Sequence, residues 1–127
     1  MYTSYYSTHG TNRNSIAISV KPPEWYAGVT YPILAPTWDL VRAIKSGRIT
    51  EGEYTTEYLK LIKKRGASPY RTLADLGENA ILLCYEKPTD FCHRHIVATW
   101  IEAELGIKVP EISTIRKPTL VDEIFTF

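Results

Sequence analysis

The chain has 127 residues, enough for one domain, and 44% of them are hydrophobic. Its 15 basic and 14 acidic side chains leave a net charge of +1, so bulk charge does not drive tight binding to duplex DNA, although nucleic acid is not excluded as a partner. No apolar run approaches the roughly 18 residues of a membrane helix, and the first six residues lack the basic flank and the apolar stretch that are typical of a secretory signal. Two cysteines make no disulfide framework. We expect a single cytoplasmic domain over residues 1–127 that does not enter a membrane.

The first 36 residues predict two strands and a long loop. Residues 1–6 and 15–20 are β-rich runs, and a polar segment at 7–14 separates them. That segment is shorter than the roughly 10–12 residues of a usual parallel crossover, so the sequence leaves the pairing of the two strands open. Residues 21–36 contain four prolines and several aromatic side chains, which indicates a packed or functional loop.

The middle of the chain predicts three helices, over residues 37–47, 50–66 and 69–76. Thr37 is placed to cap the first of them. Thr50 and Glu53 have the spacing of a capping box at the start of the second.

The C-terminal third predicts a strand followed by a helix. Residues 80–85 are apolar on both faces, as in the centre of a parallel sheet. Residues 91–105 have helical periodicity and end at Gly106, residues 108–113 predict another short strand, and residues 114–127 show no clear pattern. The whole order favours a small α/β fold, in which a mostly parallel sheet is covered by helices.

The segment of residues 84–95 carries most of the chemistry, because ligands of α/β sheets bind beyond the carboxyl ends of the strands. Thr89 or Asp90 is a suitable N-cap for the helix that follows. Arg94 then falls in the first turn, where a basic side chain opposes the helix dipole unless an anion is bound. We expect Asp90, Arg94 and the helix N-terminus to hold a phosphate, with an affinity of about 4 kcal/mol, or roughly millimolar.

Aromatic side chains would strengthen such a weak phosphate site. A stacked base adds roughly 1–3 kcal/mol per aromatic contact, and Tyr5, Trp25 and Tyr26 are the expected stacking partners. His9 and Arg13 would reach the same crevice if the first strand lies beside the strand of residues 80–85; a solvated loop is the alternative. The expected ligand is a small, nucleotide-like molecule that bears a phosphate.

Glu86 is the first candidate catalytic residue. It leaves the end of a buried strand, where a half-desolvated carboxylate suits general acid/base catalysis. The alternative is an exposed side chain, or one that pairs with Lys87 or Arg94.

Cys92 and His93 are the other candidate catalytic residues. A helix N-terminus and the neighbouring basic side chains favour the thiolate form of Cys92, which permits nucleophilic or redox chemistry. The alternative for Cys92 is simple packing. Cys84 is expected to be a small core residue; a redox pair with Cys92 is allowed, but its spacing differs from the Cys-x-x-Cys of redox motifs.

The sequence predicts no metal site and no cofactor. Cys84, Cys92, His93 and His95 have no spacing typical of a zinc site. His93 and His95 differ by about 200° around a helix, so they point away from each other.

The same segment resembles a known family. Leu-Leu-Cys-Tyr-Glu-Lys-Pro at residues 82–88, followed by Phe-Cys-His-Arg-His at residues 91–95, is similar to the signature of the domain of unknown function 488 family. The opening Tyr-Thr-Ser-Tyr-Tyr at residues 2–6 also resembles its first strand, and the resemblance covers roughly residues 1–110. It implies a cytoplasmic, Rossmann-like α/β fold of a kind common in bacteria, archaea and phages.

The resemblance places the characteristic positions of the family at Cys84, Glu86, Cys92, His93 and Arg94. It brings no established activity, and it implies nucleotide or nucleic-acid metabolism, or redox chemistry through the cysteines. The segment between the first two strands is shorter than in longer members, which have a helix there. Our first hypothesis is a nucleotide- or base-directed hydrolase or transferase that uses Glu86. The alternatives are a nucleotide-binding module without catalysis and a thiol redox protein that uses Cys92.

Overall fold

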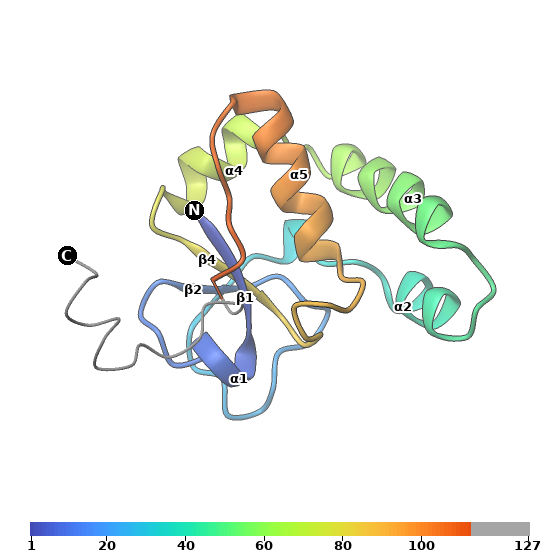
Figure 1. The fold of residues 1–127 in the computed structure, drawn as a ribbon, viewed down its shortest axis with the longest axis horizontal. Helices are drawn as coiled ribbons and strands as arrows, with labels where there is room; N and C mark the ends of the chain where they lie inside the picture. The colour runs from blue at the N-terminus through green and yellow to red at the C-terminus, as the bar shows by residue number, and fades with distance from the viewer. Residues whose placement is uncertain (113–127) are drawn as a thin grey trace.

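The computed structural model describes residues 1–112, and its centre is a sheet of short parallel strands (Figure 1). In this part of the chain the strands are β1 (Tyr2–Tyr5), β2 (Ser15–Ala17), β3 (Val29–Thr30) and β4 (Ile81–Cys84). Their order across the sheet is β1-β4-β2-β3. The predicted α/β class is therefore confirmed. The tail at residues 114–127 lies outside the described residues, as does the last position of the predicted strand at 108–113.

The position of β4 settles how the first two strands are arranged. β4 lies between β1 and β2 and pairs in parallel with both, so β1 and β2 are not neighbours. Their short connection contains only one turn of helix, α1 (Tyr6–His9). All four residues of β4 are buried, as expected for a central strand.

Side-chain alternation along β4 divides the sheet into two faces. Leu82 pairs with Ile16 of β2, and both side chains belong to the main core beneath the longer helices. Leu83 pairs with Ala17, and these two join Tyr6 in a smaller cluster on the opposite face. The apolar character of β4 on both sides thus reflects two separate sets of packing contacts.

The longer helices of the described residues are α2 (Trp38–Lys45), α3 (Glu51–Lys64), α4 (Pro69–Leu76) and α5 (His93–Leu105), and a 3-10 turn, η1 (Pro32–Leu34), precedes α2. The side chain of Thr37 accepts a hydrogen bond from the Leu40 N–H and caps α2. Thr50 and Glu53 form the predicted capping box of α3. Gly106 ends α5 with φ of 67°, a left-handed conformation that glycine adopts without steric cost.

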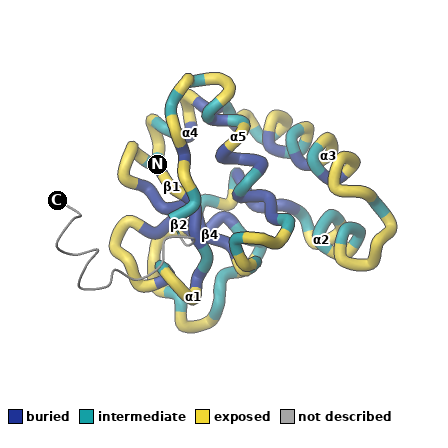
Figure 2. Tube along the Cα trace, in the orientation of Figure 1, coloured by how far each residue is buried: buried dark blue, intermediate teal, exposed yellow. Residues whose placement is uncertain are grey.

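The main core fixes the start of α5 beside the end of β4. α4 and α5 cover one face of the sheet and α1 lies at the other, while α2 and α3 extend to one side (Figure 1). Burial is deepest along β4 and the inner side of α5 (Figure 2), where Val97 and Ile101 have no exposed surface. Tyr58 and Ile62 of α3 complete this core. Full burial of one such aliphatic side chain contributes about 1.5–3 kcal/mol, so the position of α5 is strongly determined.

Two local predictions are wrong. The N-cap of α5 is Cys92, not Thr89 or Asp90, because a turn closed by the hydrogen bond from the Asp90 N–H to the Lys87 carbonyl precedes the helix. Residues 108–112 do not form the predicted strand. Their β-type pairing with β1 is limited to a parallel bridge between Thr3 and Glu111.

Candidate active site

A cavity of about 350 Å³ lies at the carboxyl ends of β2 and β4, between α2 and the start of α5. This is the edge where ligands of parallel sheets bind. Val41 and Ile44 of α2 and Phe91 provide apolar wall, while Lys45 and Glu86 are charged lining residues. The cavity thus opens beside the segment in which the sequence concentrates its candidate chemistry.

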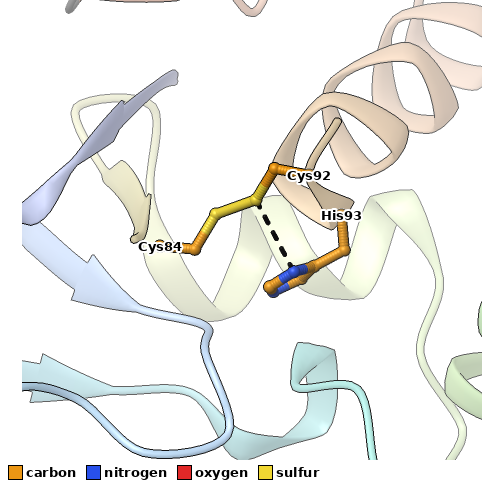
Figure 3. A group of neighbouring side chains, drawn as sticks. All are labelled: Cys84, Cys92 and His93. Atoms are coloured by element: carbon orange, nitrogen blue, oxygen red, sulfur yellow. Dashed lines mark hydrogen bonds between the residues drawn. A yellow bond between two sulfur atoms is a disulfide. The ribbon is translucent and has the colours of Figure 1, made fainter. Parts of the chain in front are cut away.

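Both cysteines of the chain meet in this cavity. Cys84 is the last residue of β4 and Cys92 is the N-cap of α5, and a disulfide joins them (Figure 3). Their Cα atoms are 7.6 Å apart, and the two residues are 1% and 3% exposed. Cys84 is buried as predicted, but it is half of a disulfide rather than a simple core residue.

The ring of His93 is held against Cys92 in one defined tautomer. Its Nε2 lies 2.7 Å from the carbonyl oxygen of Ile18, which directly follows β2. Because a carbonyl oxygen only accepts, Nε2 carries the proton and Nδ1 keeps its lone pair. That Nδ1 faces the Sγ of Cys92 at 3.8 Å (Figure 3).

Burial keeps His93 neutral. Desolvation, with a smaller contribution from the charge of Arg94, lowers the pKa of His93 to about 4, although the hydrogen bond to Ile18 acts in the opposite direction. The Nδ1 atom beside Cys92 is therefore a free acceptor at neutral pH.

Arg94 has no exposed surface and does not line the cavity. Its Nε and Nη2 donate to the two carboxylate oxygens of Glu111 at 3.1 and 3.0 Å, and the Thr3 hydroxyl donates to the same carboxylate at 2.6 Å. Its Nη1 lies 3.1 Å from the Sγ of Cys84. This geometry argues against the expected contact between Arg94 and a phosphate, because the carboxylate of Glu111 already occupies the edge of the guanidinium that an anion would bind.

Glu86 lines the cavity, and its Oε1 lies 4.0 Å from the Nζ of Lys45. The ion-pair partner is thus a side chain of α2 rather than Lys87 or Arg94. Asp90 is exposed in the turn before α5 and does not line the cavity.

The expected stacking residues lie elsewhere. Tyr26 packs edge-on against the buried Tyr6, with ring centroids 5.4 Å apart, and its hydroxyl donates to the Val29 carbonyl. Trp25 is 55% exposed and also contacts the edge of Tyr6. Neither these two residues nor Tyr5 lines the cavity.

His9 and Arg13 do not reach the cavity either. The Nδ1 of His9 is 2.6 Å from the hydroxyl of Ser4 on β1, and Arg13 is exposed in the following turn. The first strand does lie beside β4, as their role required, but α1 carries this loop onto the opposite face of the sheet.

Four aromatic residues of the cavity are absent from the residues predicted for the site: Trp38, Tyr54, Tyr85 and Phe91. Trp38, the first residue of α2, is 52% exposed beside the opening, and Tyr54 of α3 lines the wall. For Trp38, the signal available in the sequence was a tryptophan directly after the helix cap Thr37. Tyr54 fits the apolar stripe of its helix and carried no separate signal.

Comparison with known proteins adds one finding. The family model described as the active DUF488-N3 subclade matches residues 3–105. The chain belongs to the domain of unknown function 488 family. No curated protein and no solved structure matches it. Among the helices of residues 1–112, none combines the length and the hydropathy that a membrane crossing requires.

Proposed function

We propose that the protein is a thiol–disulfide oxidoreductase that acts on small disulfides through Cys84 and Cys92. One observation carries this proposal: the disulfide lies at the cavity, between a neutral histidine on one sulfur and a guanidinium on the other. The description of the subclade as active favours catalysis over a pure binding module.

In the reduced state Cys92 is the attacking residue. It sits at the N-terminus of α5, where free backbone N–H groups stabilise a thiolate. The lone pair of His93 Nδ1 accepts a hydrogen bond from the Cys92 thiol and orients its sulfur, and the thiol proton passes to solvent when the thiolate forms. The carbonyl of Ile18 orients the ring so that this nitrogen, rather than Nε2, faces the sulfur.

The reaction has two exchange steps. The Cys92 thiolate attacks one sulfur of the substrate disulfide, which forms a mixed disulfide and releases the first substrate thiolate. The Cys84 thiolate then attacks the Sγ of Cys92, which forms the internal disulfide and releases the second. Two electrons pass from the cysteine pair to the substrate, and the two cysteine protons end on the released thiols.

Arg94 has a positioning and electrostatic role in the second step. Its Nη1 donates to Cys84, which favours the thiolate of that residue. The bidentate contact with Glu111 fixes the guanidinium in this orientation.

The cavity favours a small substrate. Both sulfurs are almost fully enclosed, so a folded protein would not reach them, whereas about 350 Å³ accommodates a small organic disulfide. A cytoplasmic location fits the proposal, because disulfides there are usually transient and catalytic. The nucleotide-directed hydrolase that uses Glu86 remains a prediction, now with Lys21 and Lys45 as the cations that line the cavity.

Trapping the mixed disulfide tests the proposal. Reduced protein is mixed with hydroxyethyl disulfide and its intact mass is measured. We expect Cys84→Ser to accumulate one hydroxyethylthio adduct on Cys92, whereas the wild type passes on to the internal disulfide. Cys92→Ser should react at least about tenfold more slowly.

The matched control is Thr99→Ala, an exposed position on the same helix that should behave as the wild type. Equal reaction rates for Cys84→Ser and Cys92→Ser would contradict the proposal, because they would show two unactivated thiols. An internal disulfide that small thiols cannot reduce in the folded protein would contradict it as well.

A further inference from the structure

Three atoms that can bind a metal converge in the cavity, and they are the same atoms that the exchange reaction uses. The Sγ atoms of Cys84 and Cys92 and a ring nitrogen of His93 all lie within 4.8 Å of one another, and all three residues are buried. The spacing along the chain argued against a metal, because His93 and His95 diverge around their helix. The spacing alone could not show that the fold brings Cys84, at the end of β4, next to the start of α5.

The orientation of His93 is that of a metal ligand. Metal-binding histidines usually donate their second ring N–H to a carboxylate or a backbone carbonyl, which fixes the tautomer. Nε2 of His93 donates to the Ile18 carbonyl in this way, and the lone pair of Nδ1 faces the sulfurs.

The separation of the two cysteines leaves room for an ion. Their Cα atoms are 7.6 Å apart. This is longer than the roughly 4.4–6.8 Å that is usual in disulfides. Zinc binds each sulfur at about 2.3 Å with tetrahedral angles, which places two sulfurs about 3.8 Å apart. Breaking the disulfide therefore allows the sulfurs to separate around an ion without bringing the backbones closer.

The surrounding charges also suit a divalent cation. Two thiolates balance the charge of the ion, and the charge of Arg94 is already paired with Glu111. The Nη1 of Arg94 donates to the Sγ of Cys84, a contact that stabilises a metal-bound thiolate. In residues 1–112 the cluster contains no fourth histidine, cysteine or carboxylate ligand.

We propose that the reduced protein binds a thiophilic divalent metal ion, of which zinc(II) is the best fit, through Cys84 Sγ, Cys92 Sγ and His93 Nδ1. A thiol or phosphine reductant first supplies two electrons to the disulfide, and the ion then displaces the two thiol protons. The fourth coordination position faces the cavity, which is the arrangement of zinc sites that bind a water or substrate. The oxidised protein has no such site, so the metal and the disulfide exclude each other.

The test uses the full chain, reduced with a phosphine and freed of metal under anaerobic conditions. Cobalt(II) serves as the spectroscopic probe and zinc(II) as its competitor. We expect one cobalt per chain with sulfur-to-cobalt charge-transfer absorption, and zinc should displace it. Cys84→Ser and Cys92→Ser should each lose that absorption or at least half of it, and His93→Gln should weaken binding at least about tenfold.

His9→Gln is the matched control, because His9 lies on the other face of the sheet and should leave binding unchanged. Circular dichroism of each variant separates loss of a ligand from loss of the fold. If His93→Gln fails to fold, the wild type provides the test instead, because bound zinc should protect both of its thiols from alkylation.

Cobalt absorption that persists in the oxidised protein, or no thiol protection by zinc, would overturn the metal site. The proposed exchange activity is tested separately, because adduct trapping is run with a chelator present. If the protein exchanges disulfides but binds no metal, only the proposed metal site is wrong. If it binds metal but does not exchange disulfides, only the proposed oxidoreductase activity is wrong.

Discussion

Arg94 is a charged side chain that lies inside the protein and bonds to other side chains rather than to solvent. It is fully buried, and its guanidinium meets the carboxylate of Glu111 and the sulfur of Cys84. A buried ion pair adds little net stability over an apolar pair of the same shape, but removal of one partner is costly because the other charge loses its compensation. The role of this residue is therefore specific orientation at the site.

Replacement of Arg94 tests this role. Arg94→Met should lower the free energy of unfolding by about 3–5 kcal/mol, because the carboxylate of Glu111 loses the guanidinium. The double variant Arg94→Met with Glu111→Gln should recover most of that loss. Urea unfolding measures both, and the exposed pair Arg42–Asp39 is the control, with a loss below about 1 kcal/mol for Arg42→Met. Equal losses at the two sites would contradict the internal role of Arg94.

The buried His93 predicts a loss of stability in mild acid. Its pKa is about 4 in the folded protein, against an ordinary value of 6.5 in an unfolded chain. As pH falls below 6.5, the unfolded chain binds the proton first, so the free energy of unfolding decreases until about pH 4. The full loss is roughly 3 kcal/mol, and it is complete only below the folded pKa.

Urea unfolding of the oxidised, metal-free protein between about pH 4 and pH 7.5 measures this loss. In His93→Gln the slope of stability against pH should be smaller in that window, whatever the absolute stability of the variant. An unchanged slope would show that other groups account for the acid sensitivity.

At the scale of secondary structure, local signals predicted much of the site and long-range contacts did not. The caps at Thr37 and Thr50, the buried strand before Cys84 and the end of α5 at Gly106 follow from neighbouring residues, and all are confirmed. The contact of Arg94 with Glu111 joins residues that are 17 positions apart across the end of α5. No periodicity encodes such a contact, since it depends on how the segment after the helix returns to β1.

The lack of any local signal for long-range contacts also explains why the aromatic side chains predicted for the site do not line the cavity. The sequence shows that Tyr5, Trp25 and Tyr26 lie in its first 36 residues, but not on which face of the sheet their side chains pack. The turn at α1 carries Tyr6 into the smaller apolar cluster, and Trp25 and Tyr26 follow because they pack against its ring.

Two glycines with different surroundings, Gly10 after α1 and Gly52 in α3, give opposite predictions for replacement by alanine. A Cβ on Gly10 would lie 2.3 Å from the Trp25 ring and 2.6 Å from the Tyr6 carbonyl oxygen, so the backbone would have to move. We expect Gly10→Ala to cost about 1–3 kcal/mol. Gly52 lies in α3 with its nearest such neighbour 3.9 Å away, so Gly52→Ala should stabilise the protein by about 0.5–1 kcal/mol. Thermal unfolding of both variants checks this, and a neutral Gly10→Ala would show that the Trp25 ring and α1 adapt freely.

At the scale of the whole molecule, the state of the two sulfurs couples chemistry to folding. The disulfide closes a loop between residues that are eight positions apart, and such a cross-link reduces the entropy of the unfolded chain. Reduction removes that restraint, and a metal that binds only the folded state would replace it. The oxidised protein and the reduced, metal-bound protein are thus two stabilised forms of one fold, with the reduced, metal-free protein as the weakest.

Unfolding measured in three states tests this coupling. Reduction should lower the free energy of unfolding by about 2–3 kcal/mol, the entropic contribution of a loop this short. Zinc at about 100 times its dissociation constant should then restore about 2.7 kcal/mol, because it binds the folded chain and competes with unfolding by mass action. The variant Cys84→Ser should respond to neither reductant nor zinc, since it lacks both the cross-link and one ligand. A wild type whose stability rises on reduction would mean that the disulfide opposes the native packing, and the reduced thiol pair would then be the resting form of the site.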